Sequence, residues 1–332
     1  MSFIEEIKQR AKTQIKTIVL PEATDIRILK AAETVKQERY AKTILIGDEE
    51  QVRKIAKQNT IDIEGIEIID PLKSERTQEY AQKLFELRKA KGMTEEQAQK
   101  LVLDPVYFGM MMVKNEDADG LVSGACHSTS DTLRPALQIL KTAPNTKLVS
   151  AFFVIVVPNC EYGSNGTFIF ADSGLNEEPN SDALSEIAIS SSKSFEQLVG
   201  EKAKVAMLSY STYGSAHSAS TEKVIEATKL VREKAPEILV DGELQLDAAI
   251  IPEVAEFKAK GSPLKGEANV LVFPDLGAGN IGYKLAQRLA KAEAYGPLCQ
   301  GIAKPVNDLS RGCSASDVAG VIAITAVQAK NI

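Results

Sequence analysis

The chain has 332 residues and a mass of 35.9 kDa, with 44% hydrophobic and 25% charged residues, enough for two domains with large cores. Its formal net charge of -6 lies in no long run of one sign, and aromatic residues make up only 5%, so no nucleic-acid-binding face is expected. The longest apolar run, residues 151–157, is too short to span a bilayer, and the first residues lack a signal-peptide pattern. We therefore expect a cytoplasmic protein with neither a nucleic-acid nor a membrane partner.

Short β-branched runs alternate with amphipathic segments from Lys16 onward. The run KTIVLPE precedes Asp25 to Glu38, where apolar residues recur at helical spacing, and KTILIGD follows. The alternation continues through IDIEGIEIID, a charged helical stretch from Ser74 to Leu101, and DGLVSGA. This pattern predicts an α/β fold with mainly parallel strands and helices on both faces of the sheet.

Two polar breaks divide the chain. The first is TAPNTK, Thr142 to Lys147, and the second is AYGPL around Gly296 and Pro297. Between them lies a second α/β unit, and the last 35 or so residues are too few to bury a core of their own. We expect a discontinuous first domain, 1–147 plus 298–332, with the second domain, 148–297, inserted, and the loop of the last segment at a cleft between them.

Loops that leave the carboxyl ends of parallel strands line the ligand crevice of such folds. In SGACHSTSDTLRP, Ser128, Thr129 and Arg134 surround an expected helix N-terminus that could hold an anion, although the same hydroxyls would serve equally as helix caps. In LSYSTYGSAHS, Ser211 and Thr212 offer further donors, and ordinary turn chemistry is the better interpretation there when the segment is taken alone.

A glycine pattern, G-x-G-x-x-G, stands in PDLGAGNIGYK between an expected strand and helix, which is the context of dinucleotide binding. The acidic residue that would bind a ribose about 20 positions later is missing. The segment therefore predicts a tight turn close to a phosphate, with Gly279 and Asn280 as candidate contacts, and not an NAD site.

The segment KPVNDLSRGCSASDV, Lys304 to Val318, concentrates reactive side chains between a short strand and an apolar helix. Ser314 and Asp317 fit a capping box at the start of that helix. Arg311 can bind an anion through two N–H groups, and Ser310 and Asp317 lie near it in sequence. These residues predict a cation, a hydroxyl and a carboxylate that converge at the cleft. G-x-S-x-G, Walker A and H-E-x-x-H are absent, which removes the corresponding hydrolase, P-loop and zincin interpretations.

Six blocks in order resemble the phosphate acetyltransferase (phosphotransacetylase) family over nearly the whole chain. They are SGACHSTSDTLRPALQ, ADSGLNEEPNSDAL, MLSYSTYGSA, DGELQLDAA, VFPDLGAGNIGYK and KPVNDLSRGCSASD. The resemblance implies reversible acetyl transfer between coenzyme A and inorganic phosphate. It also implies two three-layer α/β domains flanking a cleft, similar to isocitrate and isopropylmalate dehydrogenases, a homodimer, and no permanently bound cofactor, since coenzyme A or acetyl-CoA is a substrate.

The resemblance also assigns roles to individual residues. Ser310, Arg311 and Asp317 match the catalytic serine, arginine and aspartate of the family, with Asp317 taking the thiol proton of coenzyme A. Arg134 matches an arginine that handles phosphate or coenzyme A, and Arg88 in ELRKAKG resembles a second one. The candidate substrate-binding set is then Arg134, Arg88, Ser128, Thr129, Ser211, Thr212, Gly279 and Asn280, with no metal ligand.

Three alternatives remain open. A phosphate butyryltransferase shares the chemistry and would differ in its acyl pocket. An NAD-dependent dehydrogenase of related fold would need a divalent metal, for which Asp241 and Asp247 are the only nearby pair. A sensor of coenzyme A or acyl phosphate would bind without turnover.

The four cysteines, Cys126, Cys160, Cys299 and Cys313, suggest neither disulfides nor a metal site, and Cys160 and Cys313 are expected to be bystanders.

Overall fold

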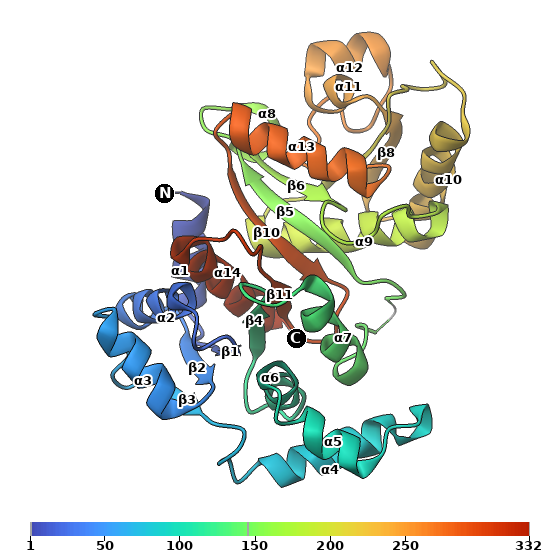
Figure 1. Cartoon of the computed structure of the whole chain (residues 1–332). Helices are drawn as coiled ribbons and strands as arrows, with labels where there is room; N and C mark the ends of the chain where they lie inside the picture. The colour runs from blue at the N-terminus through green and yellow to red at the C-terminus, as the bar shows by residue number, and fades with distance from the viewer. Residues whose placement is uncertain (1, 145, 332) are drawn as a thin grey trace. The chain divides into compact units, whose positions relative to one another are not determined.

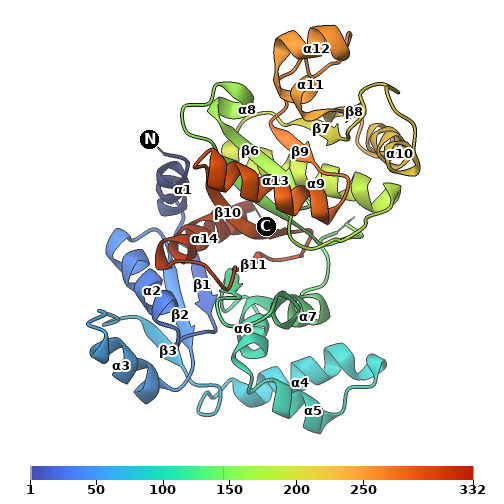
Figure 2. The same cartoon turned by 45° about the horizontal axis from the view of Figure 1, so that its top comes forward.

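The computed structural model describes residues 2–144 and 146–331 (Figures 1 and 2). Contacts within the chain divide it into two compact units. The first comprises Met1–Pro144 and Ile302–Ile332, and the second comprises Asn145–Gly301. Each unit has its own sheet, so the two are described separately. No helix among the described residues is both long and apolar enough to cross a membrane.

The sheet of the first unit has five strands in the order β11-β4-β1-β2-β3, and every neighbouring pair is parallel. The strands are β1 (Thr17–Leu20), β2 (Lys42–Ile46), β3 (Glu67–Ile69), β4 (Gly120–Ser123) and β11 (Val306–Asp308). The last residue of β11, Asp308, pairs in register with the last residue of β4, Ser123. Because the strands are parallel, the loops after β1, β4 and β11 leave the same edge of the sheet.

Helices cover both faces of this sheet (Figure 2). They are α1 (Phe3–Lys12), α2 (Ile26–Glu38), α3 (Glu49–Gln58), α4 (Thr77–Arg88), α5 (Glu95–Leu101), α6 (Pro105–Lys114), α7 (Thr129–Ile139) and α14 (Ala315–Gln328). Helix α14 contacts α1, α2, β1 and β4, whereas α6 contacts α7 and the sheet from the other side. The helix expected after Asp25 is confirmed as α2, with Asp25 as its N-cap.

The charged stretch from Ser74 to Leu101 is not one helix, which corrects the expectation. Helix α4 ends at Arg88 and continues as a 3₁₀ turn that stops at Gly92, whose φ of 86° lies in the left-handed region. Helix α5 then starts anew at Thr94, which forms a capping box with Gln97. A left-handed glycine followed by a capping residue ends one helix and begins another, although the charge pattern runs through both.

Helix α14 is a core helix that anchors the loop before it. Every residue from Val318 to Gln328 is buried. Full burial of one such Val or Ile side chain stabilises the fold by about 1.5–3 kcal/mol. The start of α14 is therefore held firmly, and the loop of residues 309–314 has a rigid end point.

The second unit has a six-stranded sheet in the order β10-β5-β6-β9-β7-β8. The strands are β5 (Ser150–Val156), β6 (Thr167–Ala171), β7 (Lys204–Leu208), β8 (Leu239–Leu244), β9 (Val270–Val272) and β10 (Glu293–Gln300). Strand β5 is antiparallel to both of its neighbours, and the other pairs are parallel. The predicted α/β class with mainly parallel sheets is confirmed.

The helices of the second unit are α8 (Tyr162–Asn165), α9 (Ser181–Val199), α10 (Ala219–Lys234), α11 (Leu246–Ile250), α12 (Pro252–Lys258) and α13 (Leu276–Leu289). Helix α9 packs on β6, β7 and β9, and α10 packs on β7 and β8. Helix α13 lies on β5, β6 and β10, where the ring of Tyr283 stacks on that of Phe153 with centroids 4.0 Å apart.

The glycine pattern does not form the expected tight turn. Gly277, Gly279 and Gly282 all lie inside α13, whose N-cap is Asp275. A Cβ at Gly279 would overlap the main-chain oxygen of Asp172, so glycine is needed there for close packing of the helix on the end of β6. The spacing therefore reflects helix packing in this chain.

Candidate active site

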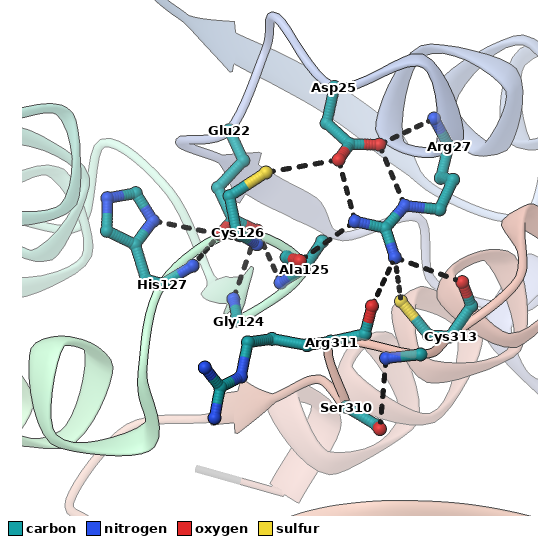
Figure 3. Close-up of polar contacts among 11 residues, drawn as sticks. Glu22, Asp25, Arg27, Gly124, Ala125, Cys126, His127, Ser310, Arg311 and Cys313 are labelled. Carbon is teal, nitrogen blue, oxygen red and sulfur yellow. Dashed lines mark hydrogen bonds and ion pairs between the residues drawn. The ribbon is translucent and has the colours of Figure 1, made fainter.

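The loops after β1, β4 and β11 meet in the first unit and form one network of polar contacts (Figure 3). The segment after β1 contributes Glu22, the α2 N-cap Asp25 and Arg27 in the first turn of α2, and the loop after β4 contributes residues 124–127. The loop after β11 contributes Ser310, Arg311 and Cys313. These are three neighbouring strands of the sheet, so the topology brings together segments about 100 and 280 residues apart in sequence.

Glu22 organises the loop after β4 (Figure 3). Its side chain is 1% exposed, and its Oε2 accepts hydrogen bonds from the backbone N–H groups of Gly124 (3.0 Å) and Ala125 (2.9 Å). Its Oε1 accepts from the backbone N–H groups of Cys126 (2.7 Å) and His127 (2.9 Å), and lies 2.8 Å from Nδ1 of His127. A buried carboxylate with this many N–H partners is well compensated.

Asp25 and Arg27 form an ion pair beside Glu22. The Arg27 guanidinium donates to both oxygens of Asp25, at 3.0 Å and 2.7 Å, and lowers the pKa of that carboxyl to about 2. The thiol of Cys126 also donates to Asp25, at 3.1 Å. The remaining N–H groups of Arg27 reach the loops after β4 and β11.

The predicted catalytic residues Ser310, Arg311 and Asp317 are close in sequence, and all three are exposed. The Oγ of Ser310 accepts a hydrogen bond from the backbone N–H of Gly312, at 3.3 Å. The guanidinium of Arg311 has no hydrogen-bond or ion-pair partner in the part of the chain that the structure describes. Asp317 forms the predicted capping box, and its Oδ2 accepts from the N–H and hydroxyl of Ser314 at 2.8 Å and 2.9 Å. The same carboxylate thus serves as a cap and offers its other oxygen to solvent.

The predicted anion-binding loop before α7 uses most of its hydroxyls internally. Ser128 is the N-cap of α7 and forms a capping box with Asp131. The Thr129 hydroxyl donates to Oδ2 of Asp308, at 2.6 Å. Arg134 is exposed and lines a hollow of about 110 Å³ together with Tyr107, His127 and Asp131. Arg134 lies in the second turn of α7, and its exposed guanidinium is available to bind an anion.

Arg88 lies at the end of α4, near the same region. It and Arg134 both lie close enough to Tyr107 to oppose the rise in the pKa of that phenol, which burial causes. The Nε of Arg88 is buried without a hydrogen-bond partner among the described residues. An arginine whose donor is left unpaired is a candidate for ligand binding, because unsatisfied buried donors are rare. The structure therefore places Arg88 of α4 and Arg134 of α7 near the same residue of α6, Tyr107.

Asp308 is a buried carboxylate at the end of β11, 2% exposed. Its Oδ1 has no hydrogen-bond partner among the described residues, and Thr129 donates to its Oδ2. Burial raises the pKa of Asp308 to about 6, against the opposing effect of the Thr129 hydroxyl. An acid whose folded pKa exceeds its unfolded value of 3.8 favours folding at low pH, and that contribution is lost as the pH rises through 6.

We expect Asp308→Asn to abolish the decrease in stability that ionisation of Asp308 causes as the pH rises. Relative to the wild type, the variant should gain unfolding free energy between pH 4 and pH 7, by up to about 3 kcal/mol at 1.36 kcal/mol per pKa unit. Urea unfolding at several pH values measures the difference, with Asp62→Asn as a control at an exposed acid whose pKa is lowered. Parallel stability curves for the wild type and Asp308→Asn would contradict the prediction.

The predicted substrate-binding residues of the second unit form hydrogen bonds or packing contacts with other residues of that unit. The Ser211 hydroxyl donates to Glu243 (2.8 Å), and the Thr212 hydroxyl oxygen accepts from the N–H of Gln245 (2.9 Å). Gly279 packs against the end of β6, and the Asn280 amide donates to the main-chain oxygen of Ser173 at 3.4 Å. These contacts give the four residues a structural role, and their part in substrate binding stays a prediction.

The acids that a metal-dependent dehydrogenase would need are occupied by other side chains. Asp241 accepts from Tyr213, Ser262 and Arg232, and Asp247 pairs with Lys258 at 2.7 Å. Within residues 2–144 and 146–331, no group of three or more His, Cys, Asp or Glu side chains is arranged to hold a metal ion. The Asp241 and Asp247 pair therefore does not support that alternative.

The thiols near the network are poor nucleophiles. Burial and the neighbouring Asp25 raise the pKa of Cys126 to about 11, and burial raises the pKa of Cys313. The thiolate is the reactive form of cysteine, so a raised pKa lowers reactivity. This favours the expectation that Cys313 is a bystander.

The sequence interpretation missed Glu22, Asp25 and Arg27. They stand in PEATDIR, directly after the first strand, and the rule that strand exits line the crevice should have included this loop. It also passed over His127. The signal was available as polar residues at a strand end, but their partners are backbone groups that composition does not reveal.

Known proteins resemble this chain along nearly its whole length. Residues 2–326 match the protein family described as "Phosphate acetyl/butaryl transferase". The chain belongs to this family. A phosphate acetyltransferase of Acetivibrio thermocellus is 65% identical over 332 residues, covering 100% of this chain and 99% of the relative. The predicted family membership is confirmed.

Solved structures of related proteins agree in fold. A phosphotransacetylase from Streptococcus pyogenes has a TM-score of 0.93 and 41% identity, and the match covers 99% of each chain. A structure from Salmonella typhimurium, described as a 4-hydroxythreonine-4-phosphate dehydrogenase, has a TM-score of 0.56 and 11% identity over 94% of this chain and 99% of that one. This chain therefore shares its fold with a protein described as a dehydrogenase, and the predicted likeness in fold to dehydrogenases is confirmed.

Proposed function

We propose that this protein is a phosphate acetyltransferase that interconverts acetyl-CoA and phosphate with acetyl phosphate and coenzyme A. The observation that carries the proposal is the full-length identity of 65% to a protein of that name. The exposed Ser310, Arg311 and Asp317 in the network of the first unit support it, because they offer the hydroxyl, the cation and the carboxylate that the reaction needs.

The proposed reaction is a direct transfer. The sulfur of coenzyme A forms a bond to the carbonyl carbon of acetyl phosphate, and the bond from that carbon to the phosphate oxygen breaks, so that phosphate leaves with its electron pair. Asp317 accepts the thiol proton through its solvent-facing oxygen. The Ser310 hydroxyl donates a hydrogen bond to the developing oxyanion and keeps its proton, and Arg311 with Arg134 neutralises the phosphate.

Proton transfer is the difficult step. A free thiol has a pKa of about 8.5 and a free aspartate about 3.9, so complete transfer between such groups is uphill by roughly 6 kcal/mol. Positioning can offset much of this gap, because oriented groups react with large effective concentrations. We therefore assign Asp317 mainly to positioning and partial proton acceptance, while nearby cations stabilise the thiolate.

The activity is tested by mixing purified protein with acetyl phosphate and coenzyme A and following thioester absorbance and phosphate release together. Equal amounts of thioester and phosphate would support the proposal. Butyryl phosphate in a parallel assay distinguishes the butyryltransferase alternative, which belongs to the same family. Binding of coenzyme A without turnover of either acyl phosphate would indicate a sensor and overturn the proposal.

Arg134→Gln should raise the apparent KM for an anionic substrate by about tenfold or more. The chain carries a net charge of -6, so anion binding depends on local arginines, and one lost charged hydrogen bond costs about 1.5–3 kcal/mol. Initial-rate kinetics with coenzyme A and acetyl phosphate varied separately measure the effect, with Arg53→Gln as the control. Arg53 is half-exposed on α3 and pairs with Glu49. An unchanged KM for both substrates would contradict the role of Arg134.

We also propose a homodimer, as the family resemblance implies. In the second unit, Ile281, Leu285 and Leu289 form a stripe at four-residue spacing on α13, and each is more than 50% exposed. Exposed apolar stripes of this kind are typical of association surfaces. A second copy that covers this stripe would remove it from water.

A further inference from the structure

The side chain of Arg27 connects three loops through all five of its N–H groups (Figure 3). Its Nε donates to Oδ1 of Asp25 at 3.0 Å, and its NH2 donates to Oδ2 of Asp25 at 2.7 Å and to the main-chain oxygen of Ala125 at 2.8 Å. Its NH1 donates to the main-chain oxygens of Arg311 (2.7 Å) and Cys313 (3.2 Å). No donor is left over for a substrate anion.

The contacts to Arg311 and Cys313 fix the backbone on both sides of Gly312. The Cys313 N–H donates to the main-chain oxygen of Ser310 at 2.9 Å, which closes the turn from the other direction. The guanidinium of Arg311 itself has no partner among the described residues. Its direction, and that of the Ser310 hydroxyl, therefore depends on how the backbone of this turn is held.

Only an arginine suits this position. The planar guanidinium presents donors in several fixed directions, whereas a lysine ammonium is a compact group that cannot reach acceptors on three separate loops at once. The side chain of Arg27 is 29% exposed, and that of Asp25 is 13% exposed, so the pair is partly shielded from water and its hydrogen bonds are stronger than those of a surface pair.

We propose that Arg27 is a positioning residue for Ser310 and Arg311, acting on catalysis through the backbone of the turn between Ser310 and Cys313. The inference rests on the proposed function. A displacement of about 1 Å in a catalytic group can cost on the order of 100-fold in rate. Loss of Arg27 should then lower kcat and leave the KM values for coenzyme A and acetyl phosphate within about threefold.

A double-mutant cycle tests whether Arg27 acts through Arg311. The variants are Arg27→Gln, Arg311→Gln and the two combined, with Arg53→Gln as a matched control on an exposed ion pair. We expect Arg27→Gln to lower kcat about 100-fold in the wild type but much less than 100-fold when Arg311→Gln is already present, the remainder being the effect on Ser310. Losses that multiply in the double variant would overturn the proposal, as would a kcat for Arg27→Gln within threefold of the wild type.

Two further measurements separate positioning from general stability. Arg27→Lys keeps the charge, and we expect its kcat to regain less than a tenth of what Arg27→Gln loses. Near-complete recovery of kcat would overturn the proposal by showing that charge alone suffices.

Hydrogen exchange of the peptide that contains Cys313 does not depend on turnover. Exchange of this peptide should become faster in both Arg27 variants and stay unchanged in Arg53→Gln. Exchange that is unchanged in all three variants would overturn the proposal. If the wild type and Arg53→Gln both fail to form thioester, the proposed function fails instead.

Discussion

Asp317→Asn should lower kcat by about 10²- to 10⁴-fold, the range typical of the loss of a general base. Asparagine keeps an oxygen that can accept from the N–H and hydroxyl of Ser314, so the capping box and the start of α14 should survive. The substitution therefore removes the proton acceptor with little change in shape. Initial rates of thioester formation across pH measure the effect.

The control for Asp317→Asn is the same change at another helix N-terminus. Asp48 is the N-cap of α3, where its carboxylate accepts from the N–H of Gln51 at 2.8 Å. Asp48→Asn should change thermal stability about as much as Asp317→Asn and leave kcat unaltered. A kcat for Asp317→Asn close to the wild-type value at every pH would show that Asp317 is a helix cap and not a base.

Glu22→Gln should lower the free energy of unfolding by about 3–5 kcal/mol, as expected when one partner of a buried charged network is removed. Both Glu22 oxygens accept from N–H groups of residues 124–127. The glutamine amide would replace one oxygen with an NH₂ group that faces these donors. Each unsatisfied buried group then carries its full cost of desolvation.

Urea unfolding of Glu22→Gln measures this loss. Glu38→Gln is the control, because Glu38 forms a single, partly exposed pair with Lys8, and such pairs near the surface contribute only about 0–1 kcal/mol. The loop after β4 should also exchange its amide hydrogens faster in Glu22→Gln. A loss of stability no larger than that of Glu38→Gln would mean that the backbone of residues 124–127 holds its shape without the carboxylate.

Much of the fold followed from the sequence because its signals are local. Alternating β-branched runs and amphipathic segments predicted an α/β fold with mainly parallel sheets, and the helix after Asp25 and the capping box of Ser314 and Asp317 were both found. Errors occurred where one local signal had two structural causes. The glycines around Gly279 suit a turn as well as close helix packing, and the charges before Leu101 suit one helix as well as two.

The candidate site was predicted in part. Ser310 and Arg311 are exposed in the loop after β11, and Arg134 is exposed in α7, the helix that follows the loop after β4. The network behind them was not foreseen, because Arg27 and Glu22 bind main-chain groups of distant loops. Every residue carries such groups, so no pattern in residues 124–127 or 310–313 indicates the partner. Only the neighbouring positions of β1, β4 and β11 bring them together.

Because the loop after β4 depends on Glu22, the conformation of this loop is specified partly by a residue far from it in sequence. Among the described residues, the hydrogen-bond partners of this carboxylate are backbone N–H groups and one ring nitrogen of His127, so its grip on the loop does not depend on the side chains of Ala125 and Cys126. The exposed side chain of Cys126 can thus change, and with it the surface chemistry of the loop, while one glutamate about 100 residues earlier holds the backbone in place. Part of what fixes this conformation therefore lies outside the segment, in Glu22, and part lies inside it, in Gly124, whose φ of 115° and close approach to Asp308 leave no room for a side chain.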